Sequence, residues 1–319
     1  MQRIISLLAL AIGAILAQPT VAQDKINLFI ATGPTSGVYY PMGGGMADLL
    51  TKHVPNLNVT AGTTAGSIAN LQLMQGKRAD VALSMADASW DAFKGQQKFQ
   101  GKPVEVRALM VLYPNRMHVV TVEGTGINKF SDLKGKRVST GAVNSATEVM
   151  ALRLMESHGL TLKDIQQERL DPGKSADAIK DKKLDAFFWV GGVPTAGVTE
   201  LAATPGIKIK MIDHDDGVAG MVKIYGPLYV RDVIPAKTYP GMDQPNRIAT
   251  VWNVLVARVD MPDQLAYDIV KTMFERKEDM IRVHKEAQNI DYKYQTNAAA
   301  VIPFHPGAAK YFADKGVKP

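Results

Sequence analysis

The chain has 319 residues, of which 46% are apolar and 21% are charged, and it contains no cysteine. This length and composition are typical of a globular protein large enough for two domains. The lack of cysteine excludes a disulfide-held scaffold and thiol-based metal or redox sites. The net charge of +6 is modest, and Lys and Arg are scattered rather than gathered into a stripe, which argues against nucleic acid as a partner.

The first residues are typical of a secretory signal. The stretch MQRIISLLALAIGAILAQPTVAQ combines Arg3, an apolar run from Ile4 to Ala17 and a small-residue region at Ala22 that suits cleavage. The run is too short to span a bilayer comfortably. We therefore expect residues 1–23 to be a signal peptide and the mature protein to reside in the periplasm.

The rest of the chain alternates between strand and helix patterns. Apolar residues at helical spacing predict helices around Met42–Leu50, Ile68–Met74 and Val149–Met155, and the run 262–284 predicts the longest helix. Short apolar runs rich in β-branched residues predict strands at residues 26–32, 57–63, 79–85, 106–113, 117–123 and 136–141. Such alternation is typical of an α/β protein with mostly parallel sheets.

Two interruptions of this pattern predict two lobes. A polar turn at residues 130–141 starts a new strand and helix, and glycines follow the apolar stretch at residues 207–213. We expect lobe two to be inserted within lobe one and the ligand to bind in a cleft between them. The expected division is lobe one at residues 24–120 and 213–319, and lobe two at residues 121–212.

Polar helix starts follow several of the predicted strands. The glycine-rich loop GPTSGVYY begins at Gly33, Ser67 is placed to cap a helix that carries Asn70, and Ser145 is placed to cap another. Ser84 lies at a fourth strand end. Ligands of open α/β sheets bind outside the carboxyl ends of strands, and helix N-termini favour anions. The pattern therefore predicts a small anionic ligand, although each cap is also explained without one.

Some residues allow more than one interpretation. Trp189 fits the core as well as a cleft wall, whereas the glycines that start at Gly191 would let the backbone approach a ligand closely. Arg116 is a charged candidate near the expected hinge, but a solvated position is the simpler interpretation. We interpret His214, among Asp213–Asp216, as part of a solvated turn rather than a metal site. No metal or cofactor is predicted.

The sequence offers little support for an enzyme. It lacks the phosphate-cradling loop that ends in Gly-Lys-Ser/Thr, the G-x-G-x-x-G fingerprint and the G-x-S-x-G turn of a nucleophilic serine. A periplasmic hydrolase that uses Ser67 or Ser145 is therefore disfavoured, and no catalytic residue is expected.

Five stretches resemble the TAXI family of TRAP-transporter solute receptors. They are ATGPTSGVYYPMGGGMADLL, VTAGTTAGSIANLQLMQGKRADVALSMADASWDAF, DLKGKRVSTGAVNSATE, LDAFFWVGGVPT and IPAKTYPGMDQ. The resemblance as a whole extends over nearly all of the mature chain. The resemblance implies a periplasmic binding protein of the type II fold, with two α/β lobes that close on a small organic acid. It implies a monomeric receptor, not an enzyme, that delivers glutamate, glutamine or a related dicarboxylate to a TRAP membrane permease.

The resemblance also assigns ligand-binding residues. These residues are Gly33, Thr35, Gly37, Tyr39, Ser67, Asn70, Asn144, Ser145 and Thr147. The strand-end pattern adds Ser84 and Gly191 to the predicted ligand-binding residues. The sequence departs from the family at Pro34, Ser36 and Met85, and these departures bear on which acid is bound. An alternative is an NMT1-like receptor of an ABC importer, or a stand-alone sensor, which would share the two lobes but serve another partner.

Overall fold

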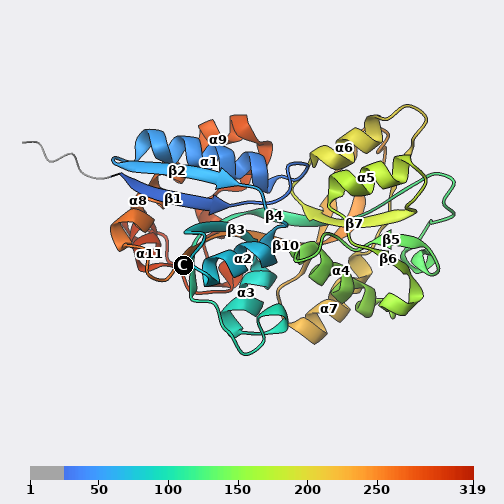
Figure 1. Ribbon diagram of the computed structural model, residues 1–319, viewed down its shortest axis with the longest axis horizontal. Coiled ribbons are helices and arrows are strands. Elements are labelled where there is room, and N and C mark those ends of the chain that lie inside the picture. Colours follow the sequence, from blue (N-terminus) through green and yellow to red (C-terminus); the bar gives the residue numbers. More distant parts are fainter. Residues whose placement is uncertain (1–24) are drawn as a thin grey trace, which may run out of the picture.

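The computed structural model describes residues 25–319 (Figure 1). The expected signal peptide lies outside the described residues. None of the helices in residues 25–319 combines the length and the apolar character that a membrane span requires.

Residues 25–319 form ten strands in one mixed sheet. The strands are β1 (Ile26–Ala31), β2 (Leu57–Gly62), β3 (Val81–Met85), β4 (Val106–Val122), β5 (Arg137–Ser139), β6 (Gln166–Glu168), β7 (Ala186–Gly191), β8 (Ile209–Met211), β9 (Val230–Ile234) and β10 (Asn246–Arg258). Their order is β2-β1-β3-β10-β4-β7-β5-β6, with β8 beside β4 and β9 beside β10.

Helices cover both faces of this sheet. In Figure 1, α2, α3, α4 and α7 lie below it, and α1, α5, α6 and α9 lie above it. The α-helices of the described chain are α1 (Tyr39–His53), α2 (Ser67–Gln75), α3 (Ala86–Lys94), α4 (Ala146–Ser157), α5 (Pro172–Lys180), α6 (Ala196–Ala203), α7 (Val218–Tyr225), α8 (Asp263–Glu275), α9 (Lys277–Val283), α10 (Asn297–Ala300) and α11 (Pro306–Asp314).

Two groups of parallel strands mark the two lobes. Strands β2, β1 and β3 are parallel at one end of the sheet, and β6, β5 and β7 are parallel at the other. We call the elements around the first group lobe one and those around the second lobe two. Between them, β10 and β4 run antiparallel to their neighbours. The predicted α/β class and two-lobe fold are confirmed, with a single mixed sheet shared by the lobes, while the residue boundaries of the lobes stay predictions.

Strand β4 joins two stretches that the sequence predicts as separate strands. Pro114 suggests a break because it has no N–H group for a sheet hydrogen bond. In the structure Pro114 pairs with Trp252, where the register of β4 and β10 shifts before Val254. An irregular site of this kind tolerates proline. Beyond it, from Arg116 onward, β4 pairs with β7 of lobe two.

The hydrophobic core is continuous on one face of the sheet and divided on the other. Strand alternation sends Ala31 and Phe188 to the face below the sheet, where one cluster extends through both lobes. It sends Ile30 to a second cluster under α1 in lobe one, and Phe187 to a third cluster in lobe two. The continuous cluster and the shared sheet hold the lobes together by burying apolar surface.

The prediction of a single helix over residues 262–284 is wrong. This segment forms two helices, α8 and α9, which meet at Arg276. Arg276 has φ −109° and ψ 25°, outside the helical region, so the chain changes direction there. Both helices lie against α1 of lobe one.

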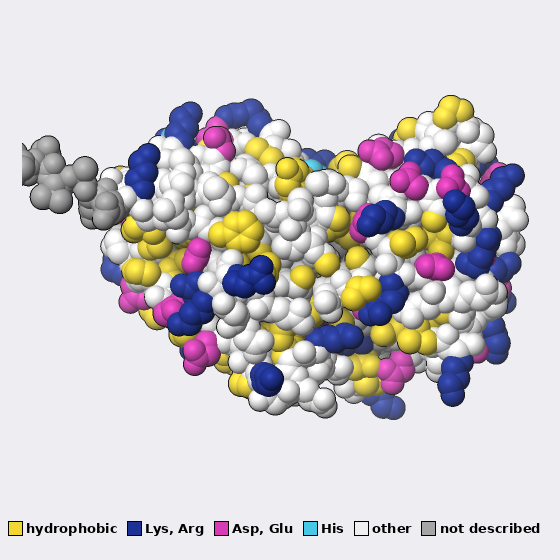
Figure 2. Space-filling view, viewed as in Figure 1, with side chains coloured by type: hydrophobic (Ala, Val, Ile, Leu, Met, Phe, Trp, Pro, Cys, Tyr) yellow, Lys and Arg dark blue, Asp and Glu magenta, His cyan; other side chains and the backbone are white. Residues whose placement is uncertain are grey.

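Charged side chains are spread over the surface. Figure 2 shows Lys and Arg interspersed with Asp and Glu over both lobes, and no basic stripe crosses the face in view. Some of the described ion pairs join two exposed side chains, such as Lys77 with Asp260. Exposed pairs of this kind contribute little to stability.

Two histidines are buried in lobe two. The ring nitrogens of His118 lie 2.9 Å from the Arg116 carbonyl oxygen and 2.8 Å from the Tyr239 hydroxyl. His214 is fully buried, so its assignment to a solvated turn is wrong. Its Nδ1 lies 2.8 Å from the carbonyl oxygen of Ile212. Burial disfavours the charged imidazole and lowers the pKa of each histidine to about 4.

We expect the protein to lose stability as the pH falls through this range. Each histidine takes up a proton near pH 6.5 in the unfolded chain but only near pH 4 in the folded one, so its contribution is complete above pH 6.5 and declines below it. By pH 5 the loss is about 2 kcal/mol per histidine. Urea unfolding at pH 7 and pH 5 measures it, and His118→Gln should reduce the difference. An equal difference in the variant would contradict this account.

Candidate functional site

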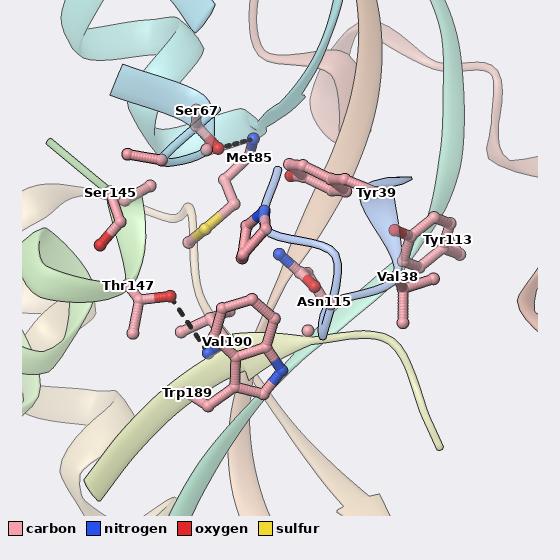
Figure 3. Close-up of a pocket in the computed structure, with 16 residues that line it drawn as sticks. Val38, Tyr39, Ser67, Met85, Tyr113, Asn115, Ser145, Thr147, Trp189 and Val190 are labelled. Carbon is pink, nitrogen blue, oxygen red and sulfur yellow. Dashed lines mark hydrogen bonds between the residues drawn. The ribbon is translucent and has the colours of Figure 1, made fainter. Parts of the chain in front are cut away.

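A cavity lies between the two lobes (Figure 3). The cavity is narrow in this arrangement of the lobes, with a volume of about 30 Å³ open to the centres of water-sized molecules, which is room for a few waters. The residues of the described chain that line it are Pro34, Gly37, Val38, Tyr39, Ala65, Gly66, Ser67, Met85, Tyr113, Asn115, Ser145, Ala146, Thr147, Trp189, Val190 and Gly191.

The cavity is at the carboxyl ends of strands from both lobes. The first loop follows β1, Ser67 begins the helix after β2, and Met85 ends β3. From lobe two, Ser145 precedes α4 and Trp189 lies near the end of β7. Parallel strands bring these ends to the same edge of the sheet, which is where open α/β folds bind ligands.

The structure brings six of the eleven predicted site residues together. Gly37, Tyr39, Ser67, Ser145, Thr147 and Gly191 line the cavity. Gly33, Thr35, Asn70, Ser84 and Asn144 do not line it. Whether the six contact a ligand stays a prediction.

The other five have identifiable positions. Asn70 is fully buried, and its Nδ2 donates to the carbonyl oxygens of Thr32 and Leu83 at 2.6 and 2.8 Å, so it ties the ends of β1 and β3 together. Ser84 is buried within β3 and accepts a 2.9 Å hydrogen bond from Ser89. Thr35 is exposed. Gly33 is packed against Tyr39, and Asn144 takes part in the contact between lobes described below.

The two predicted serine caps differ in outcome. Ser145 Oγ accepts a 3.2 Å hydrogen bond from the N–H of Glu148, so this serine caps α4 as predicted. The Glu148 carboxylate pairs with Arg169 at 2.6 Å. Ser67 is the first residue of α2 rather than its cap, and its Oγ accepts a 3.0 Å hydrogen bond from the N–H of Met85. It therefore joins the start of α2 to the end of β3 beside the cavity.

Sequence reasoning missed the polar residues that β4 places in the cavity. Tyr113 and Asn115 are 0% and 1% exposed. Within residues 25–319, Tyr113 Oη and Asn115 Oδ1 are buried side-chain atoms without a hydrogen-bond partner. Buried polar groups are nearly always paired, so unpaired groups beside a cavity indicate a position for a ligand or water. The sequence feature that could have indicated them is Pro114, which lies between Tyr113 and Asn115 in a largely apolar stretch.

Trp189 is both a core residue and a cavity wall. Its ring packs with the lobe-two cluster, and its Nε1 donates a 2.9 Å hydrogen bond to Thr195 Oγ1. Gly37 and Gly191 lie against the ring, since a Cβ atom added to either would be 3.0 Å or less from it. These glycines are needed because the backbone of the lining runs directly along the indole.

The cavity is electrically neutral in its side chains. All sixteen lining residues of the described chain are uncharged. The nearby carboxylates are paired with arginines: Asp87 lies 3.6 Å from Arg153, and Glu286 lies 2.9 Å from Arg116. Arg116 is thus held by Glu286 and, at 3.0 Å, by Asp232, so its expected solvated position is wrong. Neither arginine lines the cavity.

The lining offers uncharged hydrogen-bond donors, which are hydroxyls and backbone N–H groups, in place of charged side chains. Burial raises the pKa of Tyr39 and Tyr113, so both remain neutral hydroxyls at physiological pH. Tyr39 Oη donates to Asn253 Oδ1. Helices α1 and α2 start at the cavity, and neither has a side-chain cap in the described structure. Pro41 has no N–H group and that of Ala69 donates to Asn144, which leaves the N–H groups of Tyr39 and Tyr40 in α1 and of Ser67 and Ile68 in α2 able to serve an anion.

Backbone contacts connect the lobes around the cavity. Ser36 accepts 3.2 Å hydrogen bonds at Oγ from the Gly173 N–H and at its carbonyl oxygen from the Gly197 N–H. The N–H of Ala69 in α2 donates to the Asn144 carbonyl oxygen of lobe two at 3.1 Å. The glycine-rich first loop therefore meets the starts of α5 and α6, and α2 meets the loop before α4.

Comparison with known proteins identifies the family. The sequence matches the NMT1-like family over residues 30–316, which is most of the chain. The chain belongs to the NMT1-like family. The NMT1-like chain shares its fold with solved solute-binding proteins.

Solved structures share this fold at low sequence identity. The alkanesulfonate-binding protein SsuA from Xanthomonas axonopodis pv. citri, bound to MOPS, is 14% identical with a TM-score of 0.53, covering 93% of this chain and 86% of its own. A putative L-cystine ABC transporter protein from Listeria monocytogenes is 14% identical with a TM-score of 0.50, covering 85% and 98%. A Xanthomonas citri protein bound to ATP is 8% identical with a TM-score of 0.50, covering 90% and 94%.

The expected membership of the TAXI family is therefore wrong, and so is the TRAP permease as partner. The matched family is NMT1-like, and the similar structures include an alkanesulfonate-binding protein and an ABC transporter protein. The motifs that carried the resemblance describe strand ends, glycine-rich turns and helix starts. Such features shape a two-lobe cavity. They do not specify the membrane protein that receives the ligand.

We expect Gly191→Ala to destabilise the NMT1-like protein by about 1–3 kcal/mol, because the new methyl group would lie 2.2 Å from Trp189 Nε1 and force the ring to move. Urea unfolding measures the loss, and a shift in tryptophan fluorescence reports the displaced ring. The control is Gly44→Ala, at an exposed position in α1 with no atom within 4 Å of the added Cβ. It should raise stability by about 0.5–1 kcal/mol. Equal effects of the two substitutions would argue against tight packing at Gly191.

Proposed function

We propose that this NMT1-like protein is the periplasmic solute-binding receptor of an ABC-type importer and that it captures a small organic acid between its lobes. The observation that carries the proposal is the convergence of neutral donors on one interlobe cavity. Two uncapped helix starts and the unpaired Tyr113 hydroxyl border the same space. Preorganised N–H and O–H donors favour an anion over a neutral or cationic solute.

The chemistry of an acid fits this lining. A carboxylate or sulfonate accepts several hydrogen bonds at once and needs no proton from the protein. Candidates include glutamate, glutamine and related dicarboxylates, and also sulfonates such as those bound by the structurally similar SsuA protein. No bond-making step is required for this role, and none of the donors has a base beside it that would activate a nucleophile.

Binding and transport are linked through the lobes. The acid would enter while the lobes are apart and contact donors from lobe one together with Ser145 and Thr147 of lobe two. Its affinity for the closed arrangement would shift the population toward closure. The hydrogen bonds of Ser36 to lobe two would form in the same step. The importer would then recognise the closed surface.

A ligand screen tests the proposal. A solute that binds only the folded protein raises its melting temperature, so at least one small carboxylate or sulfonate should stabilise the protein. We expect Tyr113→Phe to weaken the binding of that acid about tenfold, as measured by calorimetry, because the hydroxyl that has no partner among the described residues can then no longer donate to the anion. The control is Tyr40→Phe, at an exposed position outside the cavity lining, which should leave affinity unchanged. Equal affinities of both variants and the wild type would reject the site.

Reconstitution tests the partner. We expect the loaded receptor to stimulate ATP hydrolysis by its own ABC permease and ATPase in liposomes several-fold more than the ligand-free receptor does. The permease without receptor gives the basal rate. ATP hydrolysis that stays at the basal rate with the loaded receptor would contradict the ABC assignment while leaving acid binding intact.

A further inference from the structure

The cavity offers hydrogen-bond donors for one anionic group, but its described lining has no charged side chain for a second charged group of the ligand. Its donors can hold an anionic head group, since α1 and α2 start there and the Tyr113 hydroxyl has no partner among the described residues. Each uncapped helix start favours an anion modestly. A second charged group on the same ligand would need a charged partner, and no lining residue in the described chain supplies one. A buried charge without a partner carries a large desolvation penalty.

Much of the remaining lining is apolar, beside the polar but uncharged Asn115, Ser145 and Thr147. Met85 and Trp189, which are 2% and 9% exposed, extend into the cavity from the two lobes (Figure 3). Val38 and Val190 add branched aliphatic surface. A hydrocarbon chain or ring would replace water against these side chains, which is favourable by about 25 cal/mol for each Å² of apolar area buried. A second carboxylate in the same place would lose its hydration without compensation, and an ammonium group could donate to Asn115 Oδ1 but would meet no opposite charge in the described lining.

The two arginines beside the cavity are not free to pair with a second charged group of the ligand. Arg153 faces Asp87 and Asp91 and donates to the Tyr229 hydroxyl at 2.7 Å, so its guanidinium is occupied within the core. Arg116 is similarly held by Glu286 and Asp232. Releasing either arginine toward a ligand would leave buried carboxylates unpaired, which costs several kcal/mol.

We infer that the ligand is a monoanionic acid with an apolar body, such as a branched aliphatic or aromatic monocarboxylate or monosulfonate, rather than a dicarboxylate or an amino acid. This inference rests on the proposed function and narrows its substrate class. The carboxylate or sulfonate binds at the helix starts and hydroxyls, and the hydrocarbon lies against Met85 and Trp189. The cavity is narrow, with about 30 Å³ open to the centres of water-sized molecules, so the lobes must part to admit the ligand and the body is limited to a small group.

A set of matched ligands tests the charge requirement. 4-Methylpentanoate is the reference. Succinate replaces its isopropyl group with a carboxylate of similar shape, leucine adds only an ammonium group, and 4-methylpentanamide removes the negative charge. 3-Methylbutane-1-sulfonate and phenylacetate vary the head group and the body. By calorimetry at pH 7.5, we expect succinate and leucine to bind at least about 100-fold more weakly than the best monoanion, and the amide at least about tenfold more weakly.

The outcomes separate this inference from the proposed function. Tighter binding of succinate, glutamate or leucine than of every monoanion would overturn the inference and leave acid binding by the receptor standing. Failure of every carboxylate and sulfonate to bind would overturn both. Binding of either monoanion head group with rejection of the doubly charged ligands supports the inference, and the comparison of the two identifies the head group.

Substitutions at Met85 test the role of the apolar wall. Met85→Gln keeps the length of the side chain but adds an amide, so the affinity for the best monoanion should fall about five- to tenfold. Met85→Leu keeps the apolar character and should retain affinity within about threefold. Each variant is first shown to unfold cooperatively in urea, so that loss of binding is not loss of fold. Unchanged affinity in a folded Met85→Gln variant would contradict the proposed contact.

Discussion

The fold depends on two strands that pass from one lobe to the other. Strands β4 and β10 lie side by side at the centre of the sheet, and each pairs with strands on its outer side. Lobe one is held through β3 on β10, and lobe two through β7 on β4. This double connection fixes the facing strand ends in register. The cavity exists because those ends, with their loops and helix starts, meet across it.

A neutral cavity is a reasonable way to recognise an acid that must also be released. A buried arginine at the site would bind a carboxylate strongly and at the cost of its own desolvation. Backbone N–H groups and hydroxyls are already fixed by the fold, so they lose little entropy on binding and leave no isolated charge when the ligand departs. The arginines of this protein serve the scaffold instead, with Arg116 and Arg153 neutralising carboxylates beside the cavity.

Local patterns predicted the local parts of this structure. The strand and helix patterns of lobe one, the α/β class and the Ser145 cap follow from periodicity and capping preferences, which act over a few residues. The continuity of β4 across Pro114 depends on pairing with β10, more than a hundred residues away. For the same reason Tyr113 and Asn115 were overlooked, because only that pairing places them at the junction of the lobes. The transport partner lay beyond the reach of these motifs altogether.

The contacts of Ser36 have a consequence for the timing of transport. Its two hydrogen bonds to the starts of α5 and α6, together with the one from Ala69 to Asn144, must break before a bound acid can leave. Each contributes about 1 kcal/mol net. Under the proposed function, the residence time of the solute would depend on how often the lobes separate as well as on its contacts within the cavity. Such a receptor would keep its solute until a membrane partner favours the separated lobes.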